Sequence, residues 1–160
     1  MPKFSNKRRV HHTADQMFDL VADVERYPEF VPLCESIRTR QRTTNPDGTE
    51  VVISEMTVSF KLVKEVFATR VTLDRTHHRI LVEYVSGSFS SLENRWTFEP
   101  SSDGGCDVGF FIAYEFKNRM LGLLMGSMFD TAFARMSSAF ERRADTIYGR
   151  KPVKPAVSSS

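Results

Sequence analysis

The chain has 160 residues, of which 41% are hydrophobic and 26% charged, and its formal net charge is +2 at pH 7. This length suffices for one domain that buries most of its apolar surface, and it is short for two. The small positive charge argues against a dedicated nucleic-acid-binding protein. The first residues lack the hydrophobic core of a signal peptide, so the expected compartment is the cytoplasm, with peripheral contact at the inner membrane surface as a further expectation.

The first expected elements are a short strand and a helix. Residues 3–10 fit an edge strand. Residues 13–16 read Thr-Ala-Asp-Gln, which is a capping-box pattern for the start of a helix. Apolar residues then recur at helical spacing, namely Met17, Leu20, Val21 and Val24. We therefore expect a helix that buries one face and ends near Tyr27-Pro28.

A stiff turn follows this helix. Residues 24–34 read Val-Glu-Arg-Tyr-Pro-Glu-Phe-Val-Pro-Leu-Cys. Pro28 and Pro32 fix their own φ angles and bias the residue before each of them away from helix. The large apolar side chains of this turn must pack against other parts of the molecule. The turn is thus expected to be either packed core or the rim of a pocket.

The remainder predicts a sheet and a long helix. Period-two stretches separated by turn signals cover residues 36–44, 50–60, 61–74, 79–85, 92–100 and 106–116. Residues 118–148 contain no proline and carry apolar residues every three or four positions, which predicts one helix. This order predicts an α+β fold, in which a curved antiparallel sheet of about seven strands wraps around the C-terminal helix. We expect one domain over residues 1–149 and a disordered tail over residues 150–160.

Such a fold leaves room for a cavity. A twisted sheet and a helix of about eight turns cannot touch along their whole length, so a gap is expected near one end. The side chains expected to face it are almost all apolar, which suits a lipid-like or aromatic ligand. They are Phe67, Val71, Trp96, Phe98, Phe110, Ile112, Met125, Met128, Phe129, Phe133 and Met136. The alternative is plain packing, because aromatic and Met residues at these spacings are commonly core residues.

The order of these motifs resembles a known family. The stretches that carry the resemblance are Tyr27-Pro28-Glu29-Phe30-Val31-Pro32-Leu33-Cys34, Gly87-Ser88-Phe89, Trp96-Thr97-Phe98 and residues 108–118. Together they are similar to the START-like coenzyme-Q-binding proteins of the polyketide cyclase and lipid-transport superfamily. The resemblance covers roughly residues 3–148. It implies a helix-grip fold and non-catalytic binding of ubiquinone by a chaperone or carrier that supports respiration.

A bacterial branch of the same family is described as a ribosome-association toxin, and both branches stay open at this point. Carried over by position, the resemblance implies a pocket rim made of Phe30, Val31, Pro32, Leu33 and Cys34. It implies a sheet floor of Trp96 and Phe98, and a helix wall that includes Met125, Met128, Phe129 and Phe133. Trp96 is the strongest candidate, since its indole offers a flat surface for a quinone ring and one N–H donor. Ubiquinone is then a bound ligand and not a catalytic cofactor, and no metal is expected.

Two surfaces are candidates for contact with larger partners. The final helix has an apolar start around Leu123, flanked by Lys117 and Arg119, which suits contact with lipid headgroups at a portal. The alternative is a helix end that packs against the proline-containing turn. Arg38, Arg40 and Arg42 alternate with apolar or neutral residues and are expected on the outer face of one strand. Such a stripe can bind ribosomal RNA or anionic lipid, or protect an edge strand from aggregation.

Enzymatic function finds less support. Wider relatives catalyse aromatic cyclisation, which needs a proton donor and an acceptor inside the pocket. The nearby charged residues fall on the outward phase of their strands, namely Glu93, Arg95, Glu99, Asp107 and Glu115. The pairs His11-His12 and His77-His78 are expected to be solvated turn residues and not metal ligands. Cys34, with no histidine expected near it, is expected to be a small apolar filler and not a nucleophile.

Overall fold

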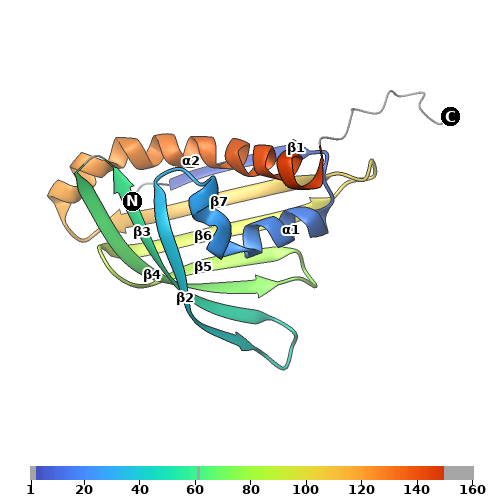
Figure 1. The fold of residues 1–160 in the computed structure, drawn as a ribbon, viewed down its shortest axis with the longest axis horizontal. Coiled ribbons are helices and arrows are strands. Elements are labelled where there is room, and N and C mark those ends of the chain that lie inside the picture. Colours follow the sequence, from blue (N-terminus) through green and yellow to red (C-terminus); the bar gives the residue numbers. More distant parts are fainter. Residues whose placement is uncertain (1–2, 61, 150–160) are drawn as a thin grey trace.

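The structure is a computed structural model that describes residues 3–60 and 62–149 (Figure 1). Its elements are β1 (Lys3–Val10), α1 (Ala14–Ala22), the 3-10 helix η1 (Val24–Glu29), β2 (Cys34–Thr44), β3 (Glu50–Phe60), β4 (Val63–Asp74), β5 (Arg79–Ser86), β6 (Phe89–Pro100), β7 (Cys106–Phe116) and α2 (Arg119–Tyr148). The tail expected to be disordered, residues 150–160, lies outside the described residues.

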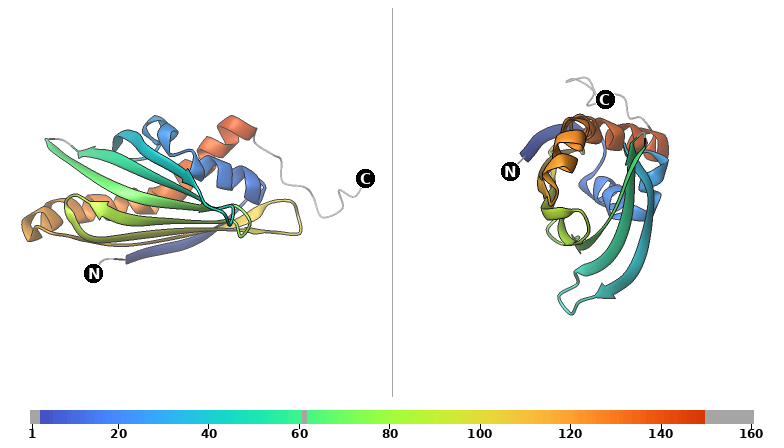
Figure 2. Two further views of the ribbon diagram at one scale, coloured as in Figure 1. Left: turned by 90° about the horizontal axis from the view of Figure 1, so that it is seen from below. Right: turned by 90° about the vertical axis from the view of Figure 1, so that its left-hand side faces the viewer.

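Within the described residues, the strands form one antiparallel sheet in the order β1-β7-β6-β5-β4-β3-β2. The sheet is curved, and both α-helices lie within its curve (Figure 2). The α1 helix contacts β5, β6 and β7, and α2 contacts β1 and β7. This is the curved sheet around a long C-terminal helix that the sequence predicts, so the expected fold class is confirmed. Neither described α-helix combines the length and the apolar character that crossing a bilayer requires.

The capping box at the start of α1 is formed as predicted. The Thr13 hydroxyl accepts a hydrogen bond from the Gln16 backbone N–H at 3.0 Å, and the Gln16 side chain accepts one from the Thr13 N–H at 2.9 Å. The helix ends at Ala22, earlier than expected, and η1 follows. The Tyr27 hydroxyl donates to the Val21 carbonyl, so a side chain beyond the helix satisfies one carbonyl of its last turn.

The two ends of α2 have different surroundings. At its start, the Asn118 side chain accepts hydrogen bonds from the N–H groups of Met120 and Leu121. At its end, α2 packs on α1, where the Tyr148 hydroxyl donates to the Gln16 carbonyl at 3.1 Å. Nearby, Nε2 of His12 lies 2.7 Å from a carboxylate oxygen of Asp145. The final turns of α2 are therefore joined to the N-terminal part of the chain.

Candidate functional site

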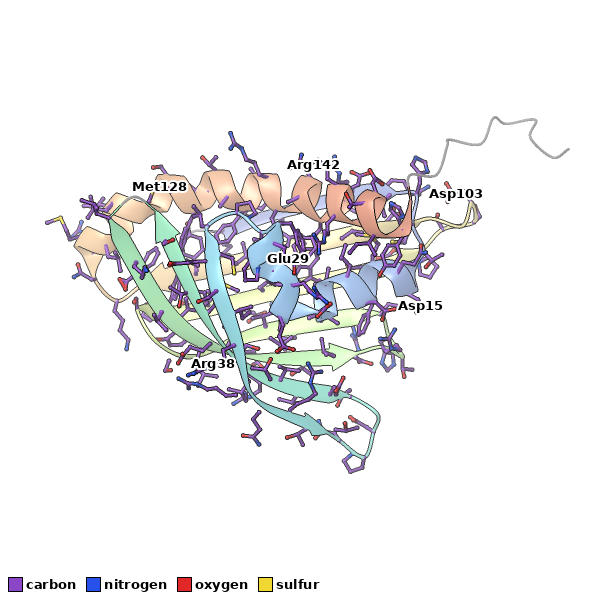
Figure 3. The ribbon with its side chains drawn as sticks, viewed as in Figure 1. Asp15, Glu29, Arg38, Asp103, Met128 and Arg142 are labelled. Atoms are coloured by element: carbon purple, nitrogen blue, oxygen red, sulfur yellow. The ribbon has the colours of Figure 1, made fainter. Side chains whose placement is uncertain are left out.

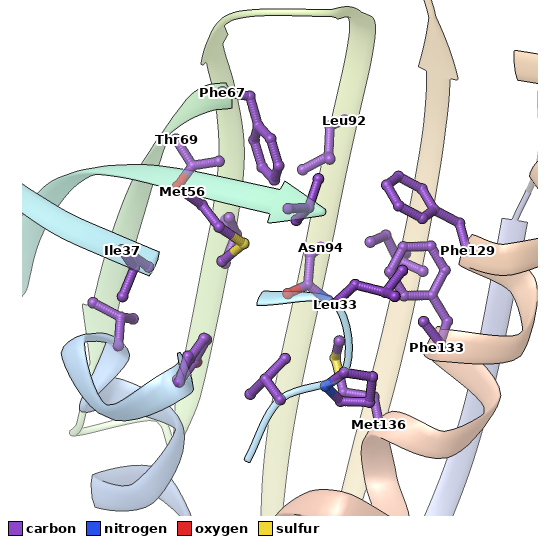
Figure 4. Close-up of a pocket in the computed structure, with 18 of the residues that line it drawn as sticks. Leu33, Ile37, Met56, Phe67, Thr69, Leu92, Asn94, Phe129, Phe133 and Met136 are labelled. Atoms are coloured by element: carbon purple, nitrogen blue, oxygen red, sulfur yellow. The ribbon is translucent and has the colours of Figure 1, made fainter. Parts of the chain in front are cut away.

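An apolar cavity of about 110 Å³ lies between the concave face of the sheet, α2 and the turn that follows η1. Figure 4 shows lining side chains from β2 to β6 and from α2 arranged around this space. Leu33 extends into it from the turn, and Phe129, Phe133 and Met136 close it on the helix side. Three separate parts of the chain thus enclose one space.

The cavity wall offers few polar groups. The polar groups of the described lining are the Tyr27 hydroxyl, the Trp96 indole N–H and the side chains of Thr69 and Asn94. The Asn94 amide already donates to the Phe111 carbonyl at 2.8 Å and accepts from the Trp96 indole N–H at 2.9 Å. Burial raises the pKa of Tyr27, whose hydroxyl is bonded to Val21. The wall therefore suits a hydrophobic molecule and lacks an acid and a base poised for proton transfer.

The cavity is narrow in this conformation. Pockets that hold drug-sized ligands typically have volumes of about 300–1,000 Å³, and an apolar cavity of about 150 Å³ holds benzene. At about 110 Å³, this cavity must widen before it accommodates a substituted ring. Met56 and Met136 are suited to such adjustment, because methionine is unbranched and adapts to irregular space.

The turn over the cavity is held in a defined conformation. Leu33 has a φ of 67°, in the left-handed region that non-glycine residues rarely adopt. Its carbonyl accepts a hydrogen bond from the Ser59 N–H at 3.0 Å, which joins the turn to β3. On the other side, Arg143 of α2 donates to Glu29, which lies beside α2 in Figure 3. This hydrogen bond lowers the pKa of the Glu29 carboxyl.

Most of the residues predicted for the ligand site lie on the cavity wall. The predicted residues found there are Val31, Pro32, Leu33, Phe67, Val71, Trp96, Phe110, Ile112, Phe129, Phe133 and Met136. Their contact with a ligand stays a prediction. The Met125 side chain, also predicted for the site, lies outside the described part of the chain.

Four predicted site residues are not on the wall. Phe30 packs edge-on against Phe140 with ring centroids 4.9 Å apart. Phe98 lies further along β6, where α1 covers the sheet, and its ring meets that of Phe18 at 6.0 Å. Cys34 is buried, and Met128 is half-buried against the core. These four side chains pack within the protein instead of lining the cavity.

Trp96 differs from the expectation in one respect. Its ring is 2% exposed and meets Phe110 and Phe140 at centroid distances of 4.8 and 4.9 Å. The indole N–H donates to Asn94, so it is not a free donor for a ligand. Trp96 is part of the wall and also part of the packed aromatic core.

Half of the wall residues were not predicted from the sequence. The lining residues not predicted are Val24, Tyr27, Ile37, Met56, Val58, Thr69, Val82, Phe89, Leu92, Asn94 and Ala132. Several are cross-strand neighbours of predicted ones: Ile37 is opposite Met56, which is opposite Phe67. Alternation along β4 identified Phe67, but its neighbours could be found only with the strand register, which one sequence does not reveal.

The expected arginine stripe on β2 is interrupted. Arg38 is opposite Glu55 and Arg42 is opposite Val52, and the register shifts between Thr39 and Gln41. Glu55 and Val52 are three residues apart on β3, so their side chains are on opposite faces of the sheet, and Arg42 does not share a face with Arg38. All three arginines are ion-paired: Arg38 (Figure 3) and Arg40 with Glu55, and Arg42 with Glu50.

The histidines differ in burial, and the Cys34 thiol is buried. His12 is 1% exposed and bonded to Asp145, so the prediction of a solvated turn residue is wrong for it. His77 is exposed and hydrogen-bonded to Asp74. Burial raises the pKa of the Cys34 thiol to about 11, which disfavours the thiolate that a nucleophile requires.

The start of α2 exposes apolar side chains. Leu123 is 76% exposed, and Met120 and Leu124 are also exposed, next to the exposed side chains of Lys117 and Arg119. Leu123 borders a cleft of about 440 Å³ with Phe116 and Gly122, and none of the residues that line this cleft lines the main cavity. The expectation that Leu123 meets a partner stays a prediction.

Comparison with known proteins gives matches over nearly the whole chain. The ribosome association toxin RatA of Escherichia coli K12 is 33% identical over 151 residues, which cover 94% of this chain and 92% of that protein. The mitochondrial coenzyme Q-binding protein COQ10 homolog B of Xenopus laevis is 30% identical over 160 residues, which cover 98% of this chain and 64% of that protein. Neither name describes an enzyme.

Solved structures also match nearly the whole chain. An 18 kDa protein of Caulobacter crescentus is 34% identical, with a TM-score of 0.76 and coverage of 93% of this chain and 99% of that one. The Zhui aromatase/cyclase of Streptomyces sp. R1128 is 16% identical with a TM-score of 0.71, over 94% of this chain and 99% of that one, and shows the fold alone. Residues 10–141 match the family described as polyketide cyclase / dehydrase and lipid transport, and the chain belongs to this family.

Proposed function

We propose that this protein is a non-catalytic binding protein whose cavity holds a hydrophobic molecule, with ubiquinone as the ligand. Its role is then that of a lipid chaperone or carrier that supports respiratory electron transport. The observation that carries the proposal is the apolar cavity, which the turn, the sheet and α2 enclose together. Further support comes from the 30% identity to a protein named as coenzyme Q-binding.

The chemistry of the wall supports binding without catalysis. A cyclase needs groups that give and take protons beside the substrate. Tyr27 is the one titratable side chain in the described lining. Its hydroxyl donates to a backbone carbonyl and is therefore not free to exchange a proton with a substrate. The Cys34 thiol is off the wall, and its pKa is raised to about 11. A molecule in this cavity is therefore expected to leave unchanged.

The decisive experiment is mass spectrometry of an organic extract of the protein purified from its native host. A polyprenylated quinone at near-stoichiometric level is the expected result. The matched control is a variant with a filled cavity, Ala132→Leu, purified in parallel, because it separates cavity-bound quinone from quinone carried over with membranes. Equal quinone in both samples, or none in the wild type, contradicts the proposal.

We further propose that the start of α2 contacts anionic membranes during ligand exchange. Exposed Leu123 and Leu124 provide an apolar surface, and Lys117 and Arg119 provide positive charge beside it. Apolar insertion together with attraction to acidic headgroups is the usual basis of interfacial helix binding. A ligand with a long isoprenoid tail requires such contact, because it resides in the bilayer.

Ribosome association is the second candidate, and the 33% identity to RatA favours it. Binding of ribosomal RNA requires positive charge at the surface. The β2 arginines, which are paired with Glu55 and Glu50, provide less free charge than their sequence indicates. Cosedimentation with large ribosomal subunits at moderate salt separates the candidates. A quinone carrier stays in the supernatant, whereas a ribosome-binding protein is found in the pellet.

A further inference from the structure

Three hydroxyl groups form a row across three neighbouring strands, beside the cavity. Thr39 of β2 is directly opposite Ser54 of β3, and Ser54 is directly opposite Thr69 of β4. Side chains of directly opposed residues lie on the same face of a sheet, with their Cβ atoms about 4.5–5.5 Å apart. Thr69 lines the cavity, so the row lies on the concave face.

The row reaches the cavity at Thr69, and Thr39 and Ser54 lie next to lining residues of their own strands. Ile37 and Met56 lie two residues from Thr39 and Ser54 along the same strands, and both line the cavity. Because side chains alternate between the two faces of a strand, residues two apart point the same way. Figure 4 shows Ile37, Met56 and Thr69 together on the side of the cavity opposite α2.

Two of the three hydroxyls are buried and unpartnered. Ser54 is 1% exposed, and its Oγ has no hydrogen-bond partner among the described residues. Oγ1 of Thr39, directly across from it, is likewise buried and unpartnered within the described chain. Buried hydroxyls are normally hydrogen-bonded, because an unmade bond leaves their desolvation uncompensated. Two of them side by side, next to Thr69 of the cavity wall, indicate a place where a ligand completes the bonding.

The surroundings restrict the chemical class of that ligand. The described cavity lining contains no Lys, Arg or His, so a carboxylate or phosphate would be buried without a counter-charge. A hydroxyl donates one hydrogen bond, and neutral carbonyl and ether oxygens accept it. The complementary ligand therefore has a neutral head with oxygen acceptors and an apolar body.

We propose that Thr39, Ser54 and Thr69 form the polar end of the ligand site and donate hydrogen bonds to carbonyl or ether oxygens of the bound head. The head then lies against β2, β3 and β4, away from the Trp96 indole, whose N–H is bonded to Asn94. This inference rests on the proposed function, since it needs a ligand in the cavity. It adds the orientation of that ligand and the requirement for neutral oxygen acceptors.

The test uses two probes and two serine variants. The probes are a ubiquinone with a short isoprenoid tail and a benzene that carries the same tail and no oxygen. Ser54→Ala removes the central donor. Ser91→Ala is the matched control. Ser91 is half-buried, and its Oγ is likewise buried and unpartnered among the described residues. Its neighbour Leu92 lines the cavity, so Ser91 faces the other side of the sheet.

Ser54→Ala is expected to weaken quinone binding roughly 2- to 10-fold, the equivalent of one hydrogen bond, and to leave binding of the hydrocarbon unchanged. Ser91→Ala is expected to change neither affinity. The melting temperature of unliganded Ser54→Ala is expected to equal or exceed that of the wild type, because an uncompensated polar group has been removed. A destabilised variant would instead indicate that Ser54 is bonded within the protein.

The outcomes separate this inference from the proposed function. Unchanged quinone affinity in Ser54→Ala overturns the inference and leaves the cavity function in place. Equal losses for both probes also overturn it, since they indicate a general disturbance of the wall. A wild-type protein that binds neither probe overturns both. A quinone-specific loss in Ser54→Ala, absent from Ser91→Ala, supports the inference.

Discussion

Filling the cavity from α2 provides a direct test of its role. Ala132 lines the cavity and is buried, whereas Ala134 is exposed on the same helix. The same substitution at both positions, Ala132→Leu and Ala134→Leu, introduces equal changes in composition and helix propensity. The first places three additional carbon atoms in a space of about 110 Å³, and the second places them in solvent.

The expected change in stability follows from area and packing. Three buried carbons at about 0.8 kcal/mol each contribute at most about 2.4 kcal/mol. Misfit in a packed wall costs about 1–3 kcal/mol. Because the larger side chain of Ala132→Leu would enter empty space, we expect the free energy of unfolding of this variant to remain equal or to rise by about 1 kcal/mol. That of Ala134→Leu is expected to change by less than about 0.5 kcal/mol.

Two measurements decide this prediction. Urea denaturation gives the free energies of unfolding, and emission of Trp96, the single Trp of the chain, gives ubiquinone affinity because its ring lines the cavity. Ala132→Leu is expected to bind at least about 10-fold more weakly, equivalent to about 1.4 kcal/mol. Ala134→Leu is expected to bind as the wild type does. A folded Ala132→Leu protein with wild-type affinity would refute the assignment of this cavity as the ligand site.

Three further predictions concern the helix start, the aromatic core and the buried thiol. Leu123→Glu is expected to abolish association with anionic liposomes, because it removes apolar contact and adds charge repulsion. Ser127→Glu, an equal change of charge on the same helix, is expected to reduce liposome association less. Equal loss of association in both variants would argue that charge alone is responsible. Trp96→Ala is expected to lower the free energy of unfolding by about 3–5 kcal/mol, because it leaves a void among packed rings, and a loss below about 1 kcal/mol by urea denaturation contradicts this. The pKa of Cys34 rises from 9.0 to about 11 on folding. The contribution of the protonated thiol to the free energy of unfolding is therefore fully present below pH 9 and is lost as the pH rises from 9 to 11. Urea denaturation across that range should therefore show a smaller decline in Cys34→Ala than in the wild type, and identical declines would count against burial as the cause.

Local signals in the sequence predicted the elements and their order. The capping box at Thr13 and the apolar spacing of α2 depend on neighbours a few residues apart, so one sequence suffices to identify them. The same spacing predicted the helix side of the cavity, where Phe129, Phe133 and Met136 are found. Pairing between distant segments could not be predicted from such local patterns.

Two of the misses depend on such pairing. The register shift at Arg40 reverses the faces of the following residues, and nothing in the alternation of residues 36–44 indicates it. The burial of His12 requires Asp145, which is 133 residues away. Trp96 is a different case, because its indole N–H is bonded to Asn94, two residues away on the same face of β6. This local partner was overlooked when the N–H was assigned to a ligand.

The unequal attachment of α2 has a consequence for how cargo enters and leaves. Tyr148 and Asp145 join the last turns to Gln16 and His12, while the first turns present Leu123 to solvent. Fluctuations that free the first turns can therefore occur while the C-terminal junction stays closed, at a lower free energy than global unfolding. Amide exchange should be fastest near residue 120 and slowest near residue 145. Loading and release of a guest molecule would then proceed by local fraying of one helix end, and the rest of the fold would stay intact.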